Sequence, residues 1–292
     1  MNDIDLIRQI INDDIAICTP IIGKGQVNRV YSVNTKNNRI IVRLNEQDEL
    51  PRFRKEAWCL EMADKVGVPS PKIIDIGTRQ NTAFMVISFV AGKNGSEIIE
   101  NKEQIWKTIG SYANKIHSIS TSRFGEDMTE LGTFRDKWER YLSYNIDSLN
   151  SKDKLLQLKT ITEKQSEEIK DRFIKLRETI FKFGLIHGDL SLENVIVQDD
   201  KVTLIDWGGA GSSIIPHMEI VDLFQNMISE KDKYFDCFLQ GYGMDRKEYE
   251  FIKPEIETLN LLQAIDKLRW AIDRSPDKIE EFSQRVKSLI EG

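Results

Sequence analysis

Three polar residues in one short stretch have the types and spacing that phosphoryl transfer requires. Asp189 and Asn194 stand five positions apart, and Asp206 follows twelve positions after Asn194. A carboxylate can accept the proton of an attacking hydroxyl, while carboxylate and amide oxygens are hard ligands that suit Mg²⁺ beside phosphate oxygens. We therefore predict Asp189 as the catalytic base and Asn194 and Asp206 as metal ligands.

The residues between Asn194 and Asp206 have the pattern of a β-hairpin. Val195 to Val197 and Val202 to Ile205 are runs rich in β-branched residues, and Gln198 to Lys201 contains an Asp-Asp turn. Folding this hairpin returns Asp206 to the side of the loop on which Asn194 lies. The two expected metal ligands are thus brought together by local structure alone.

The motifs around these residues are short, and each has an ordinary structural interpretation. His-Gly-Asp alone is typical of a turn, and Ile-Asp-Trp of a strand end with a polar cap. The five-residue interval from Asp189 to Asn194, however, is the D-x-x-x-x-N spacing of a kinase catalytic loop. Because both motifs occur in the strand, loop and hairpin order that the chemistry needs, their combination favours a kinase.

A kinase also needs a glycine-rich loop, a cation on the next strand and a helical carboxylate. Gly23, Gly25 and Asn28 lie between two expected strands in the stretch from Ile21 to Val33, where glycines let backbone N–H groups approach phosphates. A plain hairpin turn would also explain the two glycines. Arg43, on a strand expected at Arg39 to Leu44, occupies the position of the phosphate-binding lysine.

The next elements complete the expected nucleotide site. Pro51 to Gly67 is predicted as a helix that carries Glu56, which would pair with Arg43 unless it is an ordinary solvated glutamate. Thr82 to Val90 is predicted as an apolar strand that ends in a linker. Backbone groups at such a strand end can pair with the edge of an adenine ring.

Across nearly its whole length the chain resembles the aminoglycoside phosphotransferase family, the small-molecule branch of the protein-kinase-like fold. The resemblance is carried by GKGQVNRVYSV, IIVRL, RKEAWCLEMA, VGVPSPKIIDIG, MVISFVAG and, most specifically, IHGDLSLEN and LIDWGGA. It implies that the Ser88 carbonyl and the Val90 N–H bind the purine, that ATP or GTP is the donor and that Mg²⁺ is the cofactor. Ser191 and Trp207 depart from the protein-kinase motifs and no APE motif follows, so a protein substrate is disfavoured.

The order of these motifs predicts an α+β, bilobal, protein-kinase-like fold. Residues 1–92 would form an N-terminal lobe with an antiparallel sheet and the hinge, and residues 93–292 a mostly helical C-terminal lobe. Asn101 to Ser120 is predicted as a buried helix, and Phe134 to Phe183 as two long helices joined around Asn150 to Asp153.

Composition narrows the class of protein further. The 292 residues include 40% hydrophobic and 30% charged residues, as in an ordinary globular protein. Three cysteines and three histidines without ligand spacing predict neither disulfides nor a zinc site, which fits a reducing cytoplasm. The acidic N-terminus lacks the features of a signal peptide, and no apolar run is long enough for a transmembrane helix.

The net charge of −6 argues against nucleic acid as a partner and leaves room for a polycationic acceptor. Aminoglycoside-binding members of the family line their acceptor pocket with carboxylates, although a solvated helical surface would also be acidic. Trp270 is a further candidate for the pocket, and Gly208, Gly209 and Gly211 are expected to form a flexible substrate edge. The candidate acids after Asp206 are Glu219, Asp222, Glu230, Asp232, Asp236, Glu255, Glu257, Asp266 and Asp273.

The sequence therefore predicts a kinase that phosphorylates a hydroxyl of a small molecule, with an aminoglycoside antibiotic as the first candidate. A metabolic kinase acting on homoserine, choline or a sugar derivative is the alternative within enzymes. A catalytically inactive nucleotide-binding module is the alternative outside them. Neither the acceptor nor the oligomeric state follows from the sequence.

Overall fold

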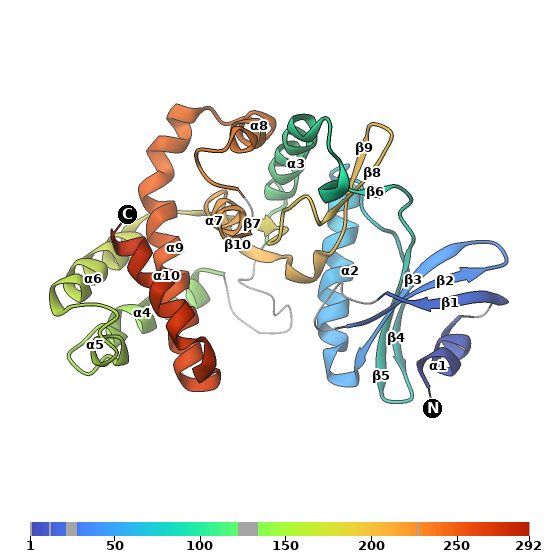
Figure 1. Cartoon of the computed structure of the whole chain (residues 1–292), viewed down its shortest axis with the longest axis horizontal. Helices are drawn as coiled ribbons and strands as arrows, with labels where there is room; N and C mark the ends of the chain where they lie inside the picture. Colours follow the sequence, from blue (N-terminus) through green and yellow to red (C-terminus); the bar gives the residue numbers. More distant parts are fainter. Residues whose placement is uncertain (1, 12, 22–27, 122–133, 227, 292) are drawn as a thin grey trace.

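The computed structural model describes residues 2–11, 13–21, 28–121, 134–226 and 228–291. Within them a sheet-rich N-terminal part is followed by a mostly helical C-terminal part (Figure 1). This arrangement confirms the α+β fold class predicted from the sequence. None of the described helices is both long and apolar enough to cross a membrane.

The described strands are β1 (Ile15–Pro20), β2 (Arg29–Thr35), β3 (Arg39–Glu46), β4 (Ile73–Arg79), β5 (Thr82–Ser88), β6 (Lys93–Asn94), β7 (Lys182–Ile186), β8 (Val195–Gln198), β9 (Lys201–Leu204) and β10 (Gly211–Ile215). The described α-helices are α1 (Asp3–Ile10), α2 (Leu50–Lys65), α3 (Lys102–His117), α4 (Phe134–Ser148), α5 (Lys154–Gln157), α6 (Glu163–Glu178), α7 (His217–Asn226), α8 (Lys233–Tyr242), α9 (Arg246–Arg274) and α10 (Ile279–Glu291). Short 3₁₀ turns lie at η1 (Gln47–Glu49), η2 (Gly95–Glu97), η3 (Trp207–Gly209) and η4 (Pro276–Lys278).

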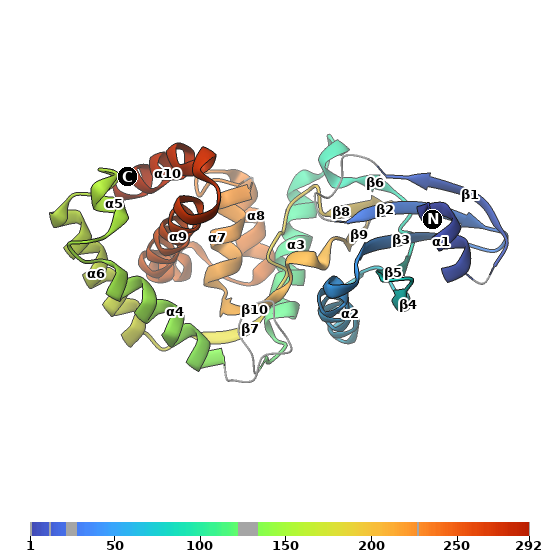
Figure 2. The ribbon, with the colours of Figure 1, turned by 90° about the horizontal axis from the view of Figure 1, so that it is seen from below.

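The N-terminal sheet is antiparallel and has the strand order β1-β2-β3-β5-β4. Side chains on a strand alternate between the two faces, so Val42 and Leu44 of β3 pack under Ile7 of α1, whereas Arg43 points to the other face. On that other face Phe53 of α2 packs against Met85 of β5. The sheet thus lies between α1 and α2 (Figure 2).

The first predicted strand lies earlier in the chain than expected. β1 ends at Pro20, before Ile21, and β2 begins at Arg29. Ile21 still donates a hydrogen bond from its N–H to the Val30 carbonyl at 2.8 Å. The apolar character of Ile21 and Ile22 suggested a strand there, but the sheet register is set by the alternating residues of β1 and β2.

Two small sheets position the segments around Asp189. β8 and β9 form the predicted hairpin, with the Asp199-Asp200 turn between them, and β6 pairs with β8 directly after the linker that follows β5. β7 and β10 pair antiparallel, and Ile186 lies opposite Gly211. The loop that follows β7 at His187 and the segment that leads into β10 at Ala210 are therefore adjacent at the same end of this strand pair.

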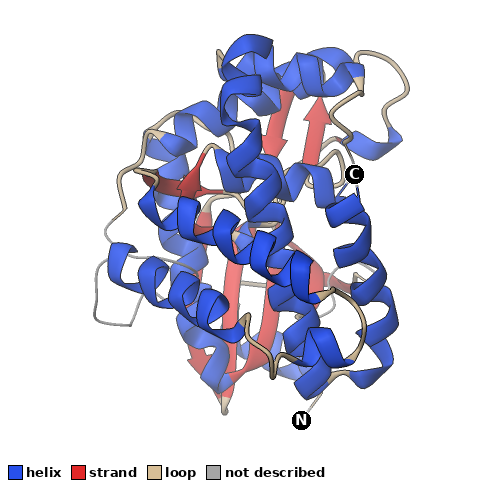
Figure 3. Cartoon of the chain, turned by 90° about the vertical axis from the view of Figure 1, so that its left-hand side faces the viewer, coloured by secondary structure: helices blue, strands red, loops and turns tan. Residues whose placement is uncertain are grey.

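The largest apolar core contains buried residues of the helices from α2 to α10 and of β7 to β10. Helices lie in front of the sheets when the molecule is viewed from its helical side (Figure 3). The segment predicted as two long helices contains α4, α5 and α6, and Lys182–Phe183 belong to β7. Asp153 caps α5 at its N-terminus, and Thr162 and Gln165 form a capping box that starts α6. The cap at Asp153 lies at the junction expected around Asn150 to Asp153. The cap at Thr162 divides the second predicted helix, because it fixes a new helix start.

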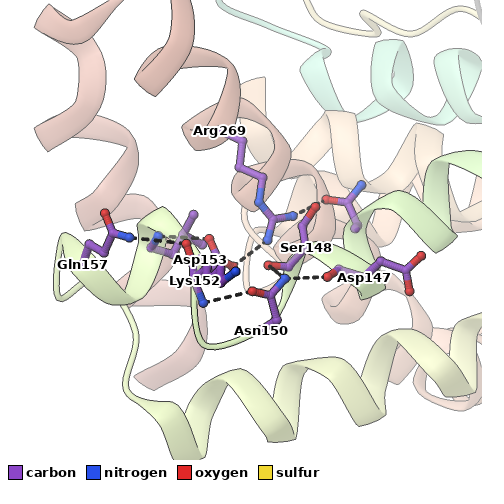
Figure 4. A network of polar contacts seen from close by, with 9 residues as sticks. Asp147, Ser148, Asn150, Lys152, Asp153, Gln157 and Arg269 are labelled. Carbon is purple, nitrogen blue, oxygen red and sulfur yellow. Dashed lines mark hydrogen bonds and ion pairs between the residues drawn. The ribbon is translucent and has the colours of Figure 1, made fainter.

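The turn between α4 and α5 is attached to α9 by a buried arginine (Figure 4). Arg269 donates hydrogen bonds to Asp153 and Asn145, both at 2.8 Å. Asn150 holds the turn itself through its side-chain contacts with Asp147 and Lys152. Trp138 and Met85 are buried.

Candidate functional site

Asp189 and Asn194 meet across the loop that follows β7. The Asn194 amide nitrogen donates to the Asp189 backbone carbonyl at 2.8 Å and to its carboxylate oxygen Oδ2 at 2.7 Å. The Asn194 amide oxygen therefore faces away from Asp189. The spacing of five residues closes a compact loop in which the Asp189 carboxylate and the Asn194 amide nitrogen are hydrogen-bonded.

The β8–β9 hairpin returns the chain to this loop, as the sequence predicted. The Ile205 N–H donates to the Asn194 carbonyl at 2.9 Å, so Ile205 lies opposite Asn194 and Asp206 is the next residue. Asp206 is exposed and adopts a left-handed backbone conformation with φ 58°. A non-glycine residue in this region is strained, and such residues are concentrated at functional sites.

The donors present suit a divalent metal ion. Asp206 supplies a carboxylate and Asn194 an amide oxygen, both hard ligands of the kind that Mg²⁺ prefers. Among the described residues no three His, Cys, Asp or Glu side chains gather to hold a metal ion. Asp206 and Asn194 can thus provide only part of a coordination shell, which phosphate oxygens and water would have to complete.

The loop before Asp189 is held by a buried carboxylate. Glu219 of α7 accepts the backbone N–H of His187 at 2.9 Å and that of Gly188 at 3.0 Å, and it contacts the His117 ring at 3.2 Å. Burial alone would raise the pKa of Glu219, but the hydrogen bond and charge of His117, together with His187, lower it. Glu219 is therefore ionised and acts on the loop backbone.

His187 also organises the loop, and His117 is buried. The Nε2–H of His187 donates to the Ile205 carbonyl at 3.1 Å, and the ring packs edge-on against Trp207. Burial lowers the pKa of His187, so its imidazole is neutral. This neutral ring joins the loop that carries Asp189 to the strand that leads to Asp206.

Arg43 and Glu56 form the ion pair that the sequence predicted. The guanidinium of Arg43 on β3 donates to the Glu56 carboxylate on α2, and both side chains are largely buried. A Cβ atom at Gly208 would lie 3.4 Å from Oδ1 of Asp206, 3.9 Å from Arg43 and 4.0 Å from Glu56. The ion pair and Asp206 therefore border the same small space.

The remaining nucleotide candidates lie on the sheet. Asn28, at the start of β2, accepts a hydrogen bond from the Asn45 side chain at 2.8 Å. The N–H of Ser88 donates to Lys72 and that of Phe89 to Arg39, and in the described residues the Val90 N–H donates to no other backbone group. Gly23 and Gly25 lie outside the described residues.

Comparison with known proteins identifies the family. The model of the phosphotransferase enzyme family matches residues 19–254. The chain belongs to this family. It is accordingly a phosphotransferase, as its sequence predicted, and the match includes the whole segment from β2 to β10.

Solved structures of other phosphotransferases share the fold. Aminoglycoside phosphotransferase APH(4)-Ia is 15% identical, with a TM-score of 0.69 over 99% of this chain and 97% of that one. Spectinomycin phosphotransferase APH(9)-Ia is 15% identical, with a TM-score of 0.62 and the same shares covered. These likenesses confirm the predicted protein-kinase-like fold.

A curated relative matches the phosphotransferase over a shorter stretch. The EKC/KEOPS complex subunit BUD32 of Debaryomyces hansenii is 29% identical over 147 residues, which are 45% of this chain and 56% of that protein. The chain thus spans little more than half the length of this relative.

Most of the candidate acids of the phosphotransferase have partners within the chain. Glu219 holds the loop, Asp232 caps α8, and Asp266 bonds to Tyr141. Glu230, Asp236 and Asp273 pair with Lys253, Arg246 and Lys154 respectively. Glu255 and Glu257 line a hollow of about 560 Å³ whose lining residues include none of Asp189, Asn194 and Asp206.

Asp222 is the candidate acid that is influenced by the charges of Glu219 and Asp189. Burial, followed by the charges of Glu219 and Asp189, raises the pKa of Asp222 to about 8. The charge of Lys267 and a hydrogen bond from Gln263 act in the opposite direction. Trp270 is exposed on the same helix as Gln263.

The glycines after Asp206 do not form the flexible edge expected from the sequence. Gly208 and Gly209 belong to the turn η3, and Gly211 begins the buried strand β10. Lys55 of α2 donates hydrogen bonds to the carbonyls of Gly208 and Ala210. The glycine content alone suggested a mobile segment. Packing against α2 and pairing with β7 hold the segment in place instead.

The sequence interpretation missed Lys55 and assigned Glu219 the wrong role. A lysine between Arg54 and Glu56 resembles any surface lysine on a helix, and the apolar residues one turn later, Trp58 and Cys59, were only a weak signal of its burial. Glu219 follows a proline at the start of a helix, which gave no indication that it faces a loop 31 residues earlier.

Proposed function

We propose that this phosphotransferase moves the γ-phosphoryl group of ATP to a hydroxyl of a small molecule, with aminoglycosides as the first class of acceptor. The observation that carries the proposal is the junction of Asp189, Asn194 and Asp206 beside the Arg43–Glu56 pair. The proposal requires a base, Asp189, two oxygen ligands and a phosphate-binding cation, Arg43, around one space.

In the proposed reaction Asp189 orients the acceptor hydroxyl and takes its proton. The hydroxyl oxygen forms a bond to the γ-phosphorus while the bond to the β-phosphate bridging oxygen breaks, and ADP leaves. Arg43 holds phosphate oxygens and is itself fixed by Glu56. Asn194 and Asp206 would hold Mg²⁺, which neutralises the charge on the phosphates when it is bound.

ATP is proposed as the donor, with GTP as the alternative. A thermostable mutant of APH(4)-Ia has been solved in a ternary complex with AMP-PNP and hygromycin B, which supports both an adenine nucleotide and an aminoglycoside. In this chain Ile87 precedes Ser88 and is not bulky enough to block adenine. The Val90 N–H and the Ser88 carbonyl would bind the purine edge.

The alternatives differ in acceptor or in activity. A metabolic kinase on homoserine, choline or a sugar derivative would use the same Asp189 but reject polyamines. A catalytically inactive module would bind nucleotide without transfer, and the retention of Asp189, Asn194 and Asp206 argues against it.

A panel of aminoglycosides, amino alcohols and sugars, assayed for acceptor-dependent ADP release, tests the proposal. We expect release with one class of acceptor, and Asp189→Ala should reduce its rate by about 10²–10⁴-fold without weakening ADP binding. Unchanged turnover of Asp189→Ala would refute the assignment of the base. Release with homoserine or choline alone would select the metabolic alternative.

A further inference from the structure

Lys55 of α2 is a buried cation held by backbone carbonyls. Its side chain is 2% exposed, and its Nζ donates to the Gly208 carbonyl at 2.7 Å and to the Ala210 carbonyl at 2.6 Å. Within the described part of the chain it forms no ion pair with a carboxylate. An ammonium group is costly to bury, so these two short hydrogen bonds, made across more than 150 positions of sequence, are its compensation.

The carbonyls that Lys55 binds belong to the turn that directly follows Asp206. Asp206 has the left-handed φ of 58°, a conformation that persists only where its surroundings enforce it. Lys55 holds the chain two and four residues beyond this strained position. The direction of the Asp206 carboxylate is therefore determined partly by a contact to α2.

The same turn of α2 reaches two other parts of the site. Glu56, the next residue, binds Arg43 of β3. Gly209, between the two carbonyls, lies against the catalytic loop, because a Cβ atom at Gly188 would approach the Gly209 carbonyl oxygen to 2.6 Å. One helical turn thus joins the phosphate-binding cation to the segment of the metal ligand.

We propose that Lys55 is a positioning residue that fixes the Asp206 segment for binding of the nucleotide-bound metal ion. The inference rests on the proposed function, since it assigns Asp206 to the metal. Lys55 contacts neither metal nor nucleotide and acts through the backbone of Gly208 and Ala210. Partners that orient a metal ligand change metal affinity by about 10–100-fold when they are removed.

Isothermal titration of ADP with and without Mg²⁺ tests this role in the full chain. Lys55→Met removes the ammonium group and keeps the length of the side chain, and Arg54→Met makes the same kind of change at an exposed neighbour on α2. In wild type Mg²⁺ should strengthen ADP binding. We expect Lys55→Met to reduce that strengthening by about 10-fold or more, with metal-free ADP affinity unchanged, and Arg54→Met to match wild type.

Lys55→Gln provides a second variant if Lys55→Met does not fold, because an amide can still donate to one carbonyl. Its Mg²⁺ effect should lie between those of wild type and an Asp206→Ala protein. Wild-type strengthening by Mg²⁺ in the folded Lys55 variants would overturn the inference. So would an equal loss of metal-free and metal-bound ADP affinity, which indicates a general structural defect. If wild-type ADP binding itself does not respond to Mg²⁺, the proposed function fails instead.

Discussion

Glu219 shows how a single carboxylate can control a loop that it does not belong to. Its two oxygens accept the successive N–H groups of His187 and Gly188, directly before Asp189. Because it is buried and ionised, these hydrogen bonds are charge-assisted and stronger than those between neutral groups. The position of the proposed base is therefore set by a residue on α7.

Replacement of Glu219 by Gln should lower kcat far more than it changes the KM for ATP. The new amide group places a donor opposite a backbone N–H, which costs about 1–3 kcal/mol and displaces the loop. A displacement near 1 Å can cost about 100-fold in rate. Steady-state kinetics measures this effect, and Glu103→Gln, at a surface pair with Lys233, is the matched control. A kcat equal to that of the control would show that the loop does not depend on Glu219.

Asp222 gives the stability of the protein a distinct pH dependence. Burial, then the charge of Glu219, raise its pKa to about 8, so the folded state keeps a proton that the unfolded state loses near its ordinary pKa of about 4. The stability contributed by this proton is complete below about pH 4 and is lost as the pH rises to about 8.

Asp222→Asn should remove this component. Urea unfolding between pH 5 and pH 8 is expected to show a wild-type free energy of unfolding that falls more steeply with pH than that of Asp222→Asn, by up to about 1.4 kcal/mol per pH unit. Parallel pH profiles for the two proteins would contradict the raised pKa of Asp222.

At the scale of elements, β3 and α2 meet through one largely buried ion pair. The alternation of β3 places Arg43 on the face that α2 covers, where Glu56 lies. Burial raises the pKa of Glu56 while the Arg43 guanidinium opposes the rise. The pair joins the sheet to the helix at the edge of the proposed site.

Glu56→Gln should destabilise the fold and weaken ATP binding together. Removing one partner of a buried pair leaves an uncompensated charge and costs about 3–5 kcal/mol. Glu61→Gln, on the exposed side of the same helix, should change the unfolding free energy little. Urea unfolding and the KM for ATP measure both effects, and equal unfolding free energies for the two variants would show that the pair is not stabilising.

The elements predicted most accurately were those determined by local sequence. The hairpin after Asn194 follows from two β-branched runs and a two-residue turn, and α2 begins and ends within a few residues of its prediction. The helix break expected around Asn150 to Asp153 is confirmed by the cap at Asp153. The second break, at Thr162, was missed, because a continuous apolar pattern does not reveal where a short helix stops.

At the scale of the whole molecule, the sequence could not supply long-range partners. Lys55, Glu219 and Asp273 each bind groups far away in the chain, so their charge alone suggested a solvated or ligand-binding surface. Asp189, Asn194 and Asp206 were identifiable since their chemistry and spacing are local. Their assignment as base and metal ligands remains a prediction.

The largest core also has a whole-molecule consequence. It includes Cys59, Leu60 and Ala63 of α2 together with buried residues of α3, β8 and β9. Because α2 packs against both the N-terminal sheet and this core, the parts that carry Arg43 and Asp206 share one structural support. We therefore expect both parts to bind one nucleotide.

A crystal structure of the full chain with AMP-PNP and Mg²⁺ tests this expectation most directly. We expect one Mg²⁺ ion that lies about 2.0–2.1 Å from an Asp206 carboxylate oxygen and from the Asn194 amide oxygen. Arg43 should contact the phosphates, and Asp189 should face the γ-phosphorus. A metal ion or triphosphate bound away from these four side chains would contradict this arrangement.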